Sequence, residues 1–279
     1  MKKISRRSFL AAAAVSAAAL ALTACGGSAS TASSAASSVA ASSEAASTSA
    51  AAAELTTVEA GKLTMATNAA FPPYEMTTDA GEFEGIDIET AQAIADKLGL
   101  ELQIDDMDFD AALLSVQQGK ADIVMAGVTV TDERKAVMDF SDSYATGIQS
   151  IIVPEGSDIA SPDDLAGKKI GTQRGTTGYI YCTDDFGEDA VVAYDSGLTA
   201  VQALNNGQVD AVVIDNAPAQ EFVAANPGLK VLDTSYAEED YAIGMAKGSA
   251  LEDAVNKALE ELKADGTLQA IVDKYINAN

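Results

Sequence analysis

Two segments of the chain, 118–127 and 206–215, repeat one pattern, and this repeat constrains the fold more than any other feature of the sequence. Each segment reads as the end of a helix, a glycine, one exposed residue and then an apolar strand. A looser repeat sets 60–62 beside 166–168. From residue 62 onward, short strands alternate with amphipathic helices, which predicts an α/β fold with largely parallel sheets. We therefore expect two similar lobes, each a largely parallel sheet flanked by helices, joined by a two-stranded hinge.

The repeat also predicts where a ligand would bind. Open α/β sheets bind ligands outside the carboxyl ends of their strands. Gly127 and Thr129 follow the repeated strand of one lobe, and Asp215 ends the repeated strand of the other. We expect these residues to oppose one another across a cleft.

The domain organisation follows from changes in composition along the chain. Segment 26–57 contains almost only Ala, Ser and Thr, so it cannot build a core and is expected to be a disordered tether. The predicted parts are a signal segment (1–25), the tether (26–57), a first lobe (58–146 plus 245–279) and a second lobe (147–244), with crossings at 144–150 and 241–246.

The first 25 residues have the pattern of an export signal. A basic start precedes an apolar run at 11–22 that is shorter than a typical membrane span. Residues 22–26 read L-T-A-C-G and resemble the lipobox of a bacterial lipoprotein, so we expect Cys25 to carry a lipid anchor. Segment 5–10 also resembles a twin-arginine signal, which leaves Sec and twin-arginine export both open. Either route predicts a location on the outer face of the cytoplasmic membrane.

The composition excludes several classes of function. Histidine is absent, which removes His-based triads, imidazole bases and His-containing metal sites. The formal net charge of −25 argues against nucleic acid as a partner. If Cys25 carries lipid, Cys182 has no cysteine to pair with, and we expect it to pack in the core. We expect a monomer without a cofactor.

An acidic cluster at 105–110 raises the question of a calcium site. Asp106, Asp108 and Asp110 have the spacing that begins an EF-hand loop. The required glycine is replaced by Ala111 and the required glutamate by Gln117, so we reject a metal here.

The stretch 122–144 contains a candidate anion site. Thr131 is expected to cap a helix that begins with two acidic residues. Arg134 then lies near the positive end of the helix dipole, where a cation is disfavoured unless something negative lies against it. The helix start, the threonine hydroxyls and the guanidinium together suit a carboxylate. The alternative is a surface ion pair between Arg134 and Asp132 or Asp139.

A second candidate anion site is the turn 173–179, which is flanked by glycines and opens a helix. It lacks the Lys-Ser/Thr ending of a P-loop, which argues against nucleotide phosphate.

Three local expectations concern helix ends and faces. Asp87 is expected to cap a helix, and Ser249 with Glu252 to form a capping box. Leu114 is expected to be buried with its neighbours on the helix that ends near Gly119.

Several motifs together carry a resemblance to a known family. They are F-P-P-Y-E at 71–75, G-I-D-I at 85–88, A-G-V-T-V-T at 126–131 followed by Arg134, D-F-S at 139–141, L-A-G-K-K at 165–169, G-T-T-G at 175–178, V-D-A-V at 209–212 and K-A-D-G-T at 263–267. With them, residues 63 to 276 resemble the polar amino-acid substrate-binding proteins of ABC importers, solute-binding family 3. The resemblance implies a periplasmic-binding-protein-like fold of type II.

The resemblance also implies roles by position. The family's arginine after the Thr-rich turn, here Arg134, grips the ligand α-carboxylate, assisted by Thr129 and the backbone around Ala126 and Gly127, with Thr177 closing from the other lobe. The family's strand-end aspartate, here Asp215, binds the ligand ammonium, although it could instead be only a helix N-cap. The predicted ligand-binding residues are Asn68, Phe71, Tyr74, Phe109, Ala126, Gly127, Thr129, Arg134, Gln173, Thr176, Thr177 and Asp215.

Five of these positions would surround the ligand side chain. Phe71 and Phe109 match aromatic walls of the family, with Tyr74 nearby, although all three could be ordinary core residues. Asn68 stands where some relatives carry an aspartate, and Gln173 falls at a position that varies with specificity.

The resemblance therefore implies a binding protein that clamps a free amino acid between two lobes and delivers it to a membrane permease. Two other functions remain open. One is a secreted dehydratase of the same fold, acting on prephenate or arogenate, for which Glu75 is the candidate general acid. The other is a lipid-anchored amino-acid sensor.

Overall fold

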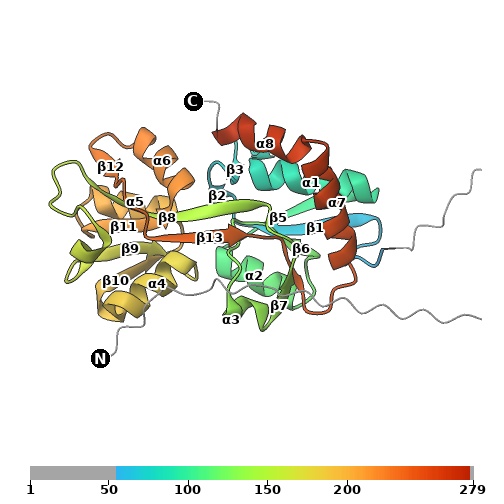
Figure 1. The fold of residues 1–279 in the computed structure, drawn as a ribbon, viewed down its shortest axis with the longest axis horizontal. Helices are drawn as coiled ribbons and strands as arrows, with labels where there is room; N and C mark the ends of the chain where they lie inside the picture. Colours follow the sequence, from blue (N-terminus) through green and yellow to red (C-terminus); the bar gives the residue numbers. More distant parts are fainter. Residues whose placement is uncertain (1–54, 277–279) are drawn as a thin grey trace, which may run out of the picture. The chain divides into compact units, whose positions relative to one another are not determined.

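The computed structural model describes residues 55–276 (Figure 1). The predicted signal segment, the lipid anchor at Cys25 and nearly all of the predicted tether lie outside the described residues. Within residues 55–276, no helix combines the length and the apolar character needed to span a membrane.

The first lobe is built on a five-stranded sheet with the order β5-β1-β6-β14-β7. The strands are β1 (Lys62–Thr67), β5 (Glu101–Asp106), β6 (Ile123–Val124), β7 (Met138–Phe140) and β14 (Gly244–Ala246). A small three-stranded sheet is formed by β2 (Ala70–Phe71), β3 (Glu75–Thr77) and β4 (Phe83–Glu84). The helices are α1 (Ile86–Leu98), α2 (Phe109–Gln117), α3 (Asp132–Lys135), α7 (Glu252–Ala264) and α8 (Thr267–Ile276).

The second lobe is built on a six-stranded sheet with the order β10-β9-β11-β8-β12, and β13 also pairs with β8. Its strands are β8 (Ala145–Pro154), β9 (Ile170–Gln173), β10 (Val191–Tyr194), β11 (Ala211–Asp215), β12 (Leu229–Val231) and β13 (Ala237–Tyr241). Its helices are α4 (Thr177–Phe186), α5 (Gly197–Asn205) and α6 (Asn216–Ala225), with short 3₁₀ turns at Pro162–Leu165 and Glu188–Ala190.

The predicted repeat is confirmed by the order of the strands. In the first lobe β1 lies between β5 and β6 and runs parallel to both, and in the second lobe β9 lies in the same way between β10 and β11. The next strand in each sheet is antiparallel to its neighbour: β14 to β6, and β8 to β11. The sheets are therefore mixed, with a parallel half that carries the repeat. β1 is nearly all buried, as expected for a strand covered on both faces.

Two long antiparallel strands, β8 and β13, run between the lobes (Figure 1). Strand β8 overlaps the predicted crossing at 144–150, whereas β13 ends at Tyr241, where the predicted crossing at 241–246 begins. They pack closely where Gly147 faces the ring of Tyr241, because a Cβ at Gly147 would lie 2.5 Å from a ring carbon. Glycine is therefore the residue that lets the two crossing strands meet at this point.

The expected cap at Asp87 is wrong. Helix α1 begins at Ile86, and the N-cap position, two residues before Asp87, is occupied by Gly85, which has a φ of 130°. A Cβ at Gly85 would lie 2.2 Å from the carbonyl oxygen of Tyr74, so this close approach fixes where the chain enters the helix. Asp87 is instead fully buried in the first turn.

Two further local expectations are also wrong. Leu114 is 49% exposed, because the buried face of α2 is turned the other way. Helix α7 begins at Glu252, so this residue cannot fill the third position of a capping box. The hydroxyl of Ser249 accepts a hydrogen bond from the backbone N–H of Leu251 at 3.2 Å instead. By contrast, Thr131 and Thr176 cap their helices, and Cys182 is buried and unpaired.

Candidate functional site

A cavity lies between the two lobes and has about 310 Å³ of space free of protein atoms, including the part open to solvent. It is lined by Asn68, Phe71, Glu75, Phe109, Ala126, Gly127, Thr129, Arg134, Gln173, Thr176, Thr177 and Asp215. Eleven of these residues are ones that the sequence predicted for the site. The lining differs from the prediction at two places: Tyr74 does not line the cavity, and Glu75 does.

Arg134 reaches the cavity from the first lobe because Thr131 fixes the start of the short helix α3. The Thr131 hydroxyl accepts a hydrogen bond from the backbone N–H of Arg134 at 3.2 Å. The guanidinium donates from Nη1 to the carbonyl oxygen of Thr129 at 2.7 Å and from Nη2 to that of Gly175, in the second lobe, at 3.2 Å. It also lies 5.3 Å from the centroid of the Phe109 ring.

The alternative of a surface ion pair at Arg134 is wrong. The side chain is buried, with 8% of its surface exposed. Asp139, one of the two proposed partners, forms its ion pair with Lys247 at 2.6 Å instead. Burial lowers the pKa of Arg134, and the attraction of Glu239 opposes that effect. The guanidinium is thus a buried positive charge at the cavity wall.

Asp215 reaches the cavity from the second lobe at the end of β11. Its Oδ2 accepts a hydrogen bond from Gln149 Nε2 at 2.8 Å, and its Oδ1 accepts one from the hydroxyl of Tyr241. Burial, and then the negative charge of Glu239, raise the pKa of Asp215 to about 7. Asp215 holds the N-cap position of α6, but its side chain makes no capping hydrogen bond, so a role only as a cap is wrong.

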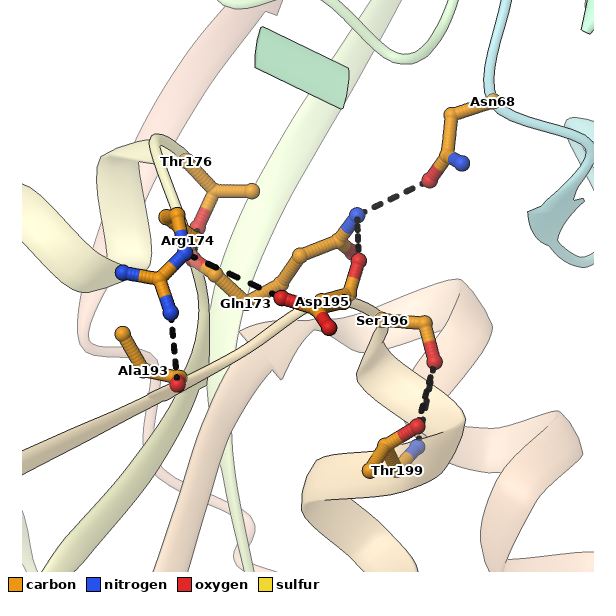
Figure 2. Close-up of polar contacts among 8 residues, drawn as sticks. All are labelled: Asn68, Gln173, Arg174, Thr176, Ala193, Asp195, Ser196 and Thr199. Atoms are coloured by element: carbon orange, nitrogen blue, oxygen red, sulfur yellow. Dashed lines mark hydrogen bonds and ion pairs between the residues drawn. The ribbon is translucent and has the colours of Figure 1, made fainter. Parts of the chain in front are cut away.

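Two amide side chains meet across the cavity from opposite lobes. Figure 2 shows Gln173 and Asn68 pointing toward one another, and Gln173 Nε2 donates to Asn68 Oδ1 at 2.8 Å. Gln173 Nε2 also lies 3.4 Å from the carbonyl oxygen of Asp195. Arg174, the next residue, points elsewhere, because its guanidinium donates to the carbonyl oxygen of Ala193 at 3.3 Å (Figure 2).

The aromatic residues divide between the cavity wall and the layer behind it. Phe71 and Phe109 line the cavity. The Tyr74 ring lies behind Phe71, with ring centroids 6.0 Å apart, and meets the Tyr241 ring edge-on at 5.3 Å. Tyr74 therefore supports the wall through packing, and its predicted direct contact with a ligand is not supported by the geometry.

A buried carboxyl pair lies beneath the Gly127 turn. Asp87 Oδ2 accepts from the backbone N–H of Gly127 at 3.0 Å, and Oδ1 accepts from the hydroxyl of Tyr144 at 2.7 Å. Burial raises the pKa of Asp87 to about 6. Burial and the neighbouring Asp87 raise the pKa of Glu75 well above its usual range. Asp87 thus holds the backbone of the cavity wall, and Glu75 is a buried carboxyl beside the cavity.

Glu239 was not among the site residues predicted from the sequence. It lies on β13 and is 6% exposed. Its Oε2 accepts hydrogen bonds from Thr177 Oγ1 at 3.0 Å, Gln149 Nε2 at 3.0 Å and Thr129 Oγ1 at 3.1 Å. The available signal was the alternation along a strand, which places Glu239 on the same face as Tyr241 two residues later.

Comparison with known proteins gives consistent matches. The family described as "Bacterial extracellular solute-binding proteins, family 3" matches residues 63–278. The L-cystine-binding protein TcyJ of Escherichia coli (strain K12) is 34% identical over 226 residues, which cover 79% of this chain and 85% of that protein.

Two solved structures are similar to this one over nearly their whole length. The arginine-, lysine-, histidine-binding protein ArtJ from Geobacillus stearothermophilus matches with a TM-score of 0.75 and 34% identity, covering 78% of this chain and 96% of that one. An ancestral arginine-binding protein bound to glutamine matches with a TM-score of 0.74 and 43% identity, covering 77% of this chain and 98% of that one.

Proposed function

We propose, because this chain belongs to the bacterial extracellular solute-binding proteins of family 3, that it holds a free amino acid between its lobes and delivers it to the permease of an ABC importer. The observation that carries this proposal is the pair of opposite charges at one cavity. Arg134 comes from the first lobe and Asp215 from the second, and both line the space between them. A free amino acid has a carboxylate for the first group and an ammonium for the second.

The proposed clamp follows from which lobe supplies each group. A ligand that touches Arg134 and Asp215 at once joins the lobes, and these contacts exist only when the lobes are close together. Ligand binding then shifts the protein toward its closed form, because a ligand stabilises the conformation with which it makes more contacts. The closed form is the one that docks on the permease.

The side chain of the ligand is proposed to lie between Phe71, Phe109 and the amide pair Asn68–Gln173. The names of similar proteins include binders of cystine, of arginine, lysine and histidine, and of glutamine. All of these are α-amino acids with polar side chains. Neutral amides at this end of the cavity suit hydrogen bonding to such a side chain.

The first experiment is a thermal-shift screen of the twenty amino acids, cystine and ornithine. We expect at least one to raise the melting temperature, since a ligand that binds only the folded state stabilises it by mass action. Small-angle scattering with the best ligand should then show a smaller radius of gyration. No stabilisation by any of these ligands would refute the binding function, and an unchanged radius would refute the clamp.

The protein is further proposed to work as a monomer on the outer face of the cytoplasmic membrane, held by lipid at Cys25. The support is the lipobox-like sequence at 22–26 and the extracellular character of the family. Cys25→Ala should release the protein from the membrane fraction. Retention of this variant in that fraction would count against the anchor.

One observation favours the dehydratase as a second candidate. Glu75 is a buried carboxyl beside the cavity with a raised pKa, which is what a general acid requires. Turnover of prephenate or arogenate by the purified protein would establish this activity, and Glu75→Gln should then abolish it. A sensor role would be indicated by ligand binding without uptake of radiolabelled ligand in cells.

A further inference from the structure

The Glu239 carboxylate gathers hydrogen-bond donors from three parts of the molecule. Thr129 follows β6 in the first lobe, Thr177 begins α4 in the second lobe, and Gln149 lies on the crossing strand β8. All three donate to one oxygen, Oε2, over distances of 3.0–3.1 Å. The other oxygen, Oε1, is buried and has no hydrogen-bond partner in the described part of the chain. The bonds to Oε2 are therefore what orients the side chain.

The number of hydrogens on each group determines which atom donates and which accepts in each of these hydrogen bonds. An ionised carboxylate only accepts, whereas a threonine hydroxyl has one hydrogen to donate and two lone pairs. The hydroxyl hydrogens of Thr129 and Thr177 must therefore both point at Glu239. Although the two hydroxyl oxygens are 3.4 Å apart, neither has a hydrogen left for the other.

The Gln149 amide is fixed in the same way. Its Nε2 lies 2.8 Å from Asp215 Oδ2 and 3.0 Å from Glu239 Oε2, so its two hydrogens serve two carboxylates. The opposite amide orientation would place a carbonyl oxygen between two carboxylate oxygens, which is repulsive. Gln149 thus connects Glu239 to Asp215, the group proposed to bind the ligand ammonium.

The consequence lies on the cavity side of the two threonines. Both line the cavity, and with their hydrogens turned to Glu239 they present only lone pairs to it. A ligand carboxylate oxygen opposite these lone pairs would be repelled, whereas an ammonium group can donate to them. The Thr129 hydroxyl therefore does not assist Arg134 at the carboxylate, which is the role that the family resemblance implied. We propose that Glu239 is a positioning residue that turns Thr129 and Thr177 into acceptors and so makes this part of the cavity a receptor for the ligand ammonium. This inference rests on the amino-acid-binding function proposed above.

The balance of charge supports the same assignment. Glu239 and Asp215 are two buried carboxyl groups linked by one amide, and Arg134 is the buried cation of the cavity wall. A buried charge is costly unless it is paired and hydrogen-bonded. An ammonium close to both carboxyl groups offsets this excess of negative charge, and a neutral donor in the same place does not.

The test compares amino acids with analogues that lack only the α-amino group. The probes are L-arginine with 5-guanidinopentanoic acid, L-glutamine with 4-carbamoylbutanoic acid, and L-cystine with 3,3′-dithiodipropionic acid. If the thermal-shift screen finds a tighter ligand, that ligand and its deaminated acid are used as well. Isothermal titration, by competition for the weak analogues, is carried out with the wild type, Glu239→Gln and Glu238→Gln.

Glu239→Gln keeps the shape of the side chain and removes its charge, and the control Glu238→Gln makes the same change at an exposed residue of the same strand. We expect Glu239→Gln to weaken binding of the amino acid by about tenfold or more, since hydrogen bonds to charged groups are the stronger ones. The deaminated acid should lose less than about twofold, and Glu238→Gln should leave both affinities unchanged.

Equal losses for the amino acid and its deaminated acid would show a merely structural role and overturn the proposal, as would no loss at all. A wild type that binds none of the screened amino acids would refute the binding function itself, which is a separate result. A double-mutant cycle with Thr129→Val gives a second, independent readout. If Glu239 acts through this hydroxyl, the two changes are non-additive by about fivefold or more, and additive losses would overturn the proposal.

Discussion

Replacing Arg134 by alanine tests the carboxylate half of the site most directly. The guanidinium has five N–H donors, and two of its bonds, to the carbonyl oxygens of Thr129 and Gly175, hold it in place within the protein. Because Arg134 also lines the cavity, its remaining donors are available to a ligand carboxylate. The expected loss is therefore that of a forked, charge-assisted contact with the ligand.

The size of the loss follows from those contacts. Hydrogen bonds to charged groups contribute about 1.5–3 kcal/mol each. Two of them to one carboxylate give about 3 kcal/mol at the lower end, which is about a hundredfold in affinity. Arg134→Lys should also bind more weakly than the wild type, since a single ammonium cannot reproduce the fork that holds both the protein carbonyls and the ligand.

The assay is isothermal titration with the best ligand from the screen. The matched control is Arg174→Ala, which removes an exposed cation that points away from the cavity. Arg174 directly precedes Gly175, whose carbonyl oxygen accepts a hydrogen bond from Arg134. We expect the control to stay within about twofold of the wild type. The melting temperature of each variant is measured as well, because Arg134 also joins the two lobes. A folded Arg134→Ala variant that binds within threefold of the wild type would refute the carboxylate site.

Two further predictions concern pH and the crossing strands. Affinity for the amino acid should fall as the pH is lowered from 8 to 5.5. Asp215, whose pKa is raised to about 7, becomes protonated over this range and loses the charge that holds the ligand ammonium. Isothermal titration at both pH values measures this, and equal affinities would contradict it. Gly147→Ala should lower the free energy of unfolding by about 1–3 kcal/mol, because the new Cβ would lie 2.5 Å from the Tyr241 ring. The control Gly156→Ala, with open space around the new Cβ, should leave the free energy of unfolding unchanged. Urea unfolding of both variants measures this, and similar values for the two would contradict the predicted clash.

The sequence predicted those parts of the fold that rest on local pattern. The repeat at 118–127 and 206–215 encodes a helix end and the strand after it, and both occur in the structure with the same neighbours in each sheet. Around the cavity, Arg134 was predicted from the helix start that contains it and Asp215 from its place at the end of a repeated strand, whereas the residues around the ligand side chain were predicted from the family resemblance. Their ligand roles remain predictions.

The parts that could not be predicted depend on contacts between distant segments. The sequence of β13 (Ala237–Tyr241) is rich in acidic residues, as is typical of a loop. The segment is nevertheless a strand because it pairs with β8. Glu239 lies on that strand, so its burial could not be predicted from the local sequence either. Asp87 looked like a helix cap, but the close approach of Gly85 to the backbone of Tyr74 moved the helix start and left Asp87 to hold the Gly127 turn.

The path of the chain through the first sheet has a consequence for biosynthesis. Strand β14 lies between β6 and β7, yet it is made about a hundred residues after them, and α7 and α8 follow it. The strands of the second sheet, from β8 to β13, are contiguous in the chain. Because domains fold as units once their segments are available, we expect the lobe that is synthesised first to be completed last. Until β14 emerges, the sheet of the first lobe has a gap between β6 and β7, whereas all strands of the second lobe have already been made.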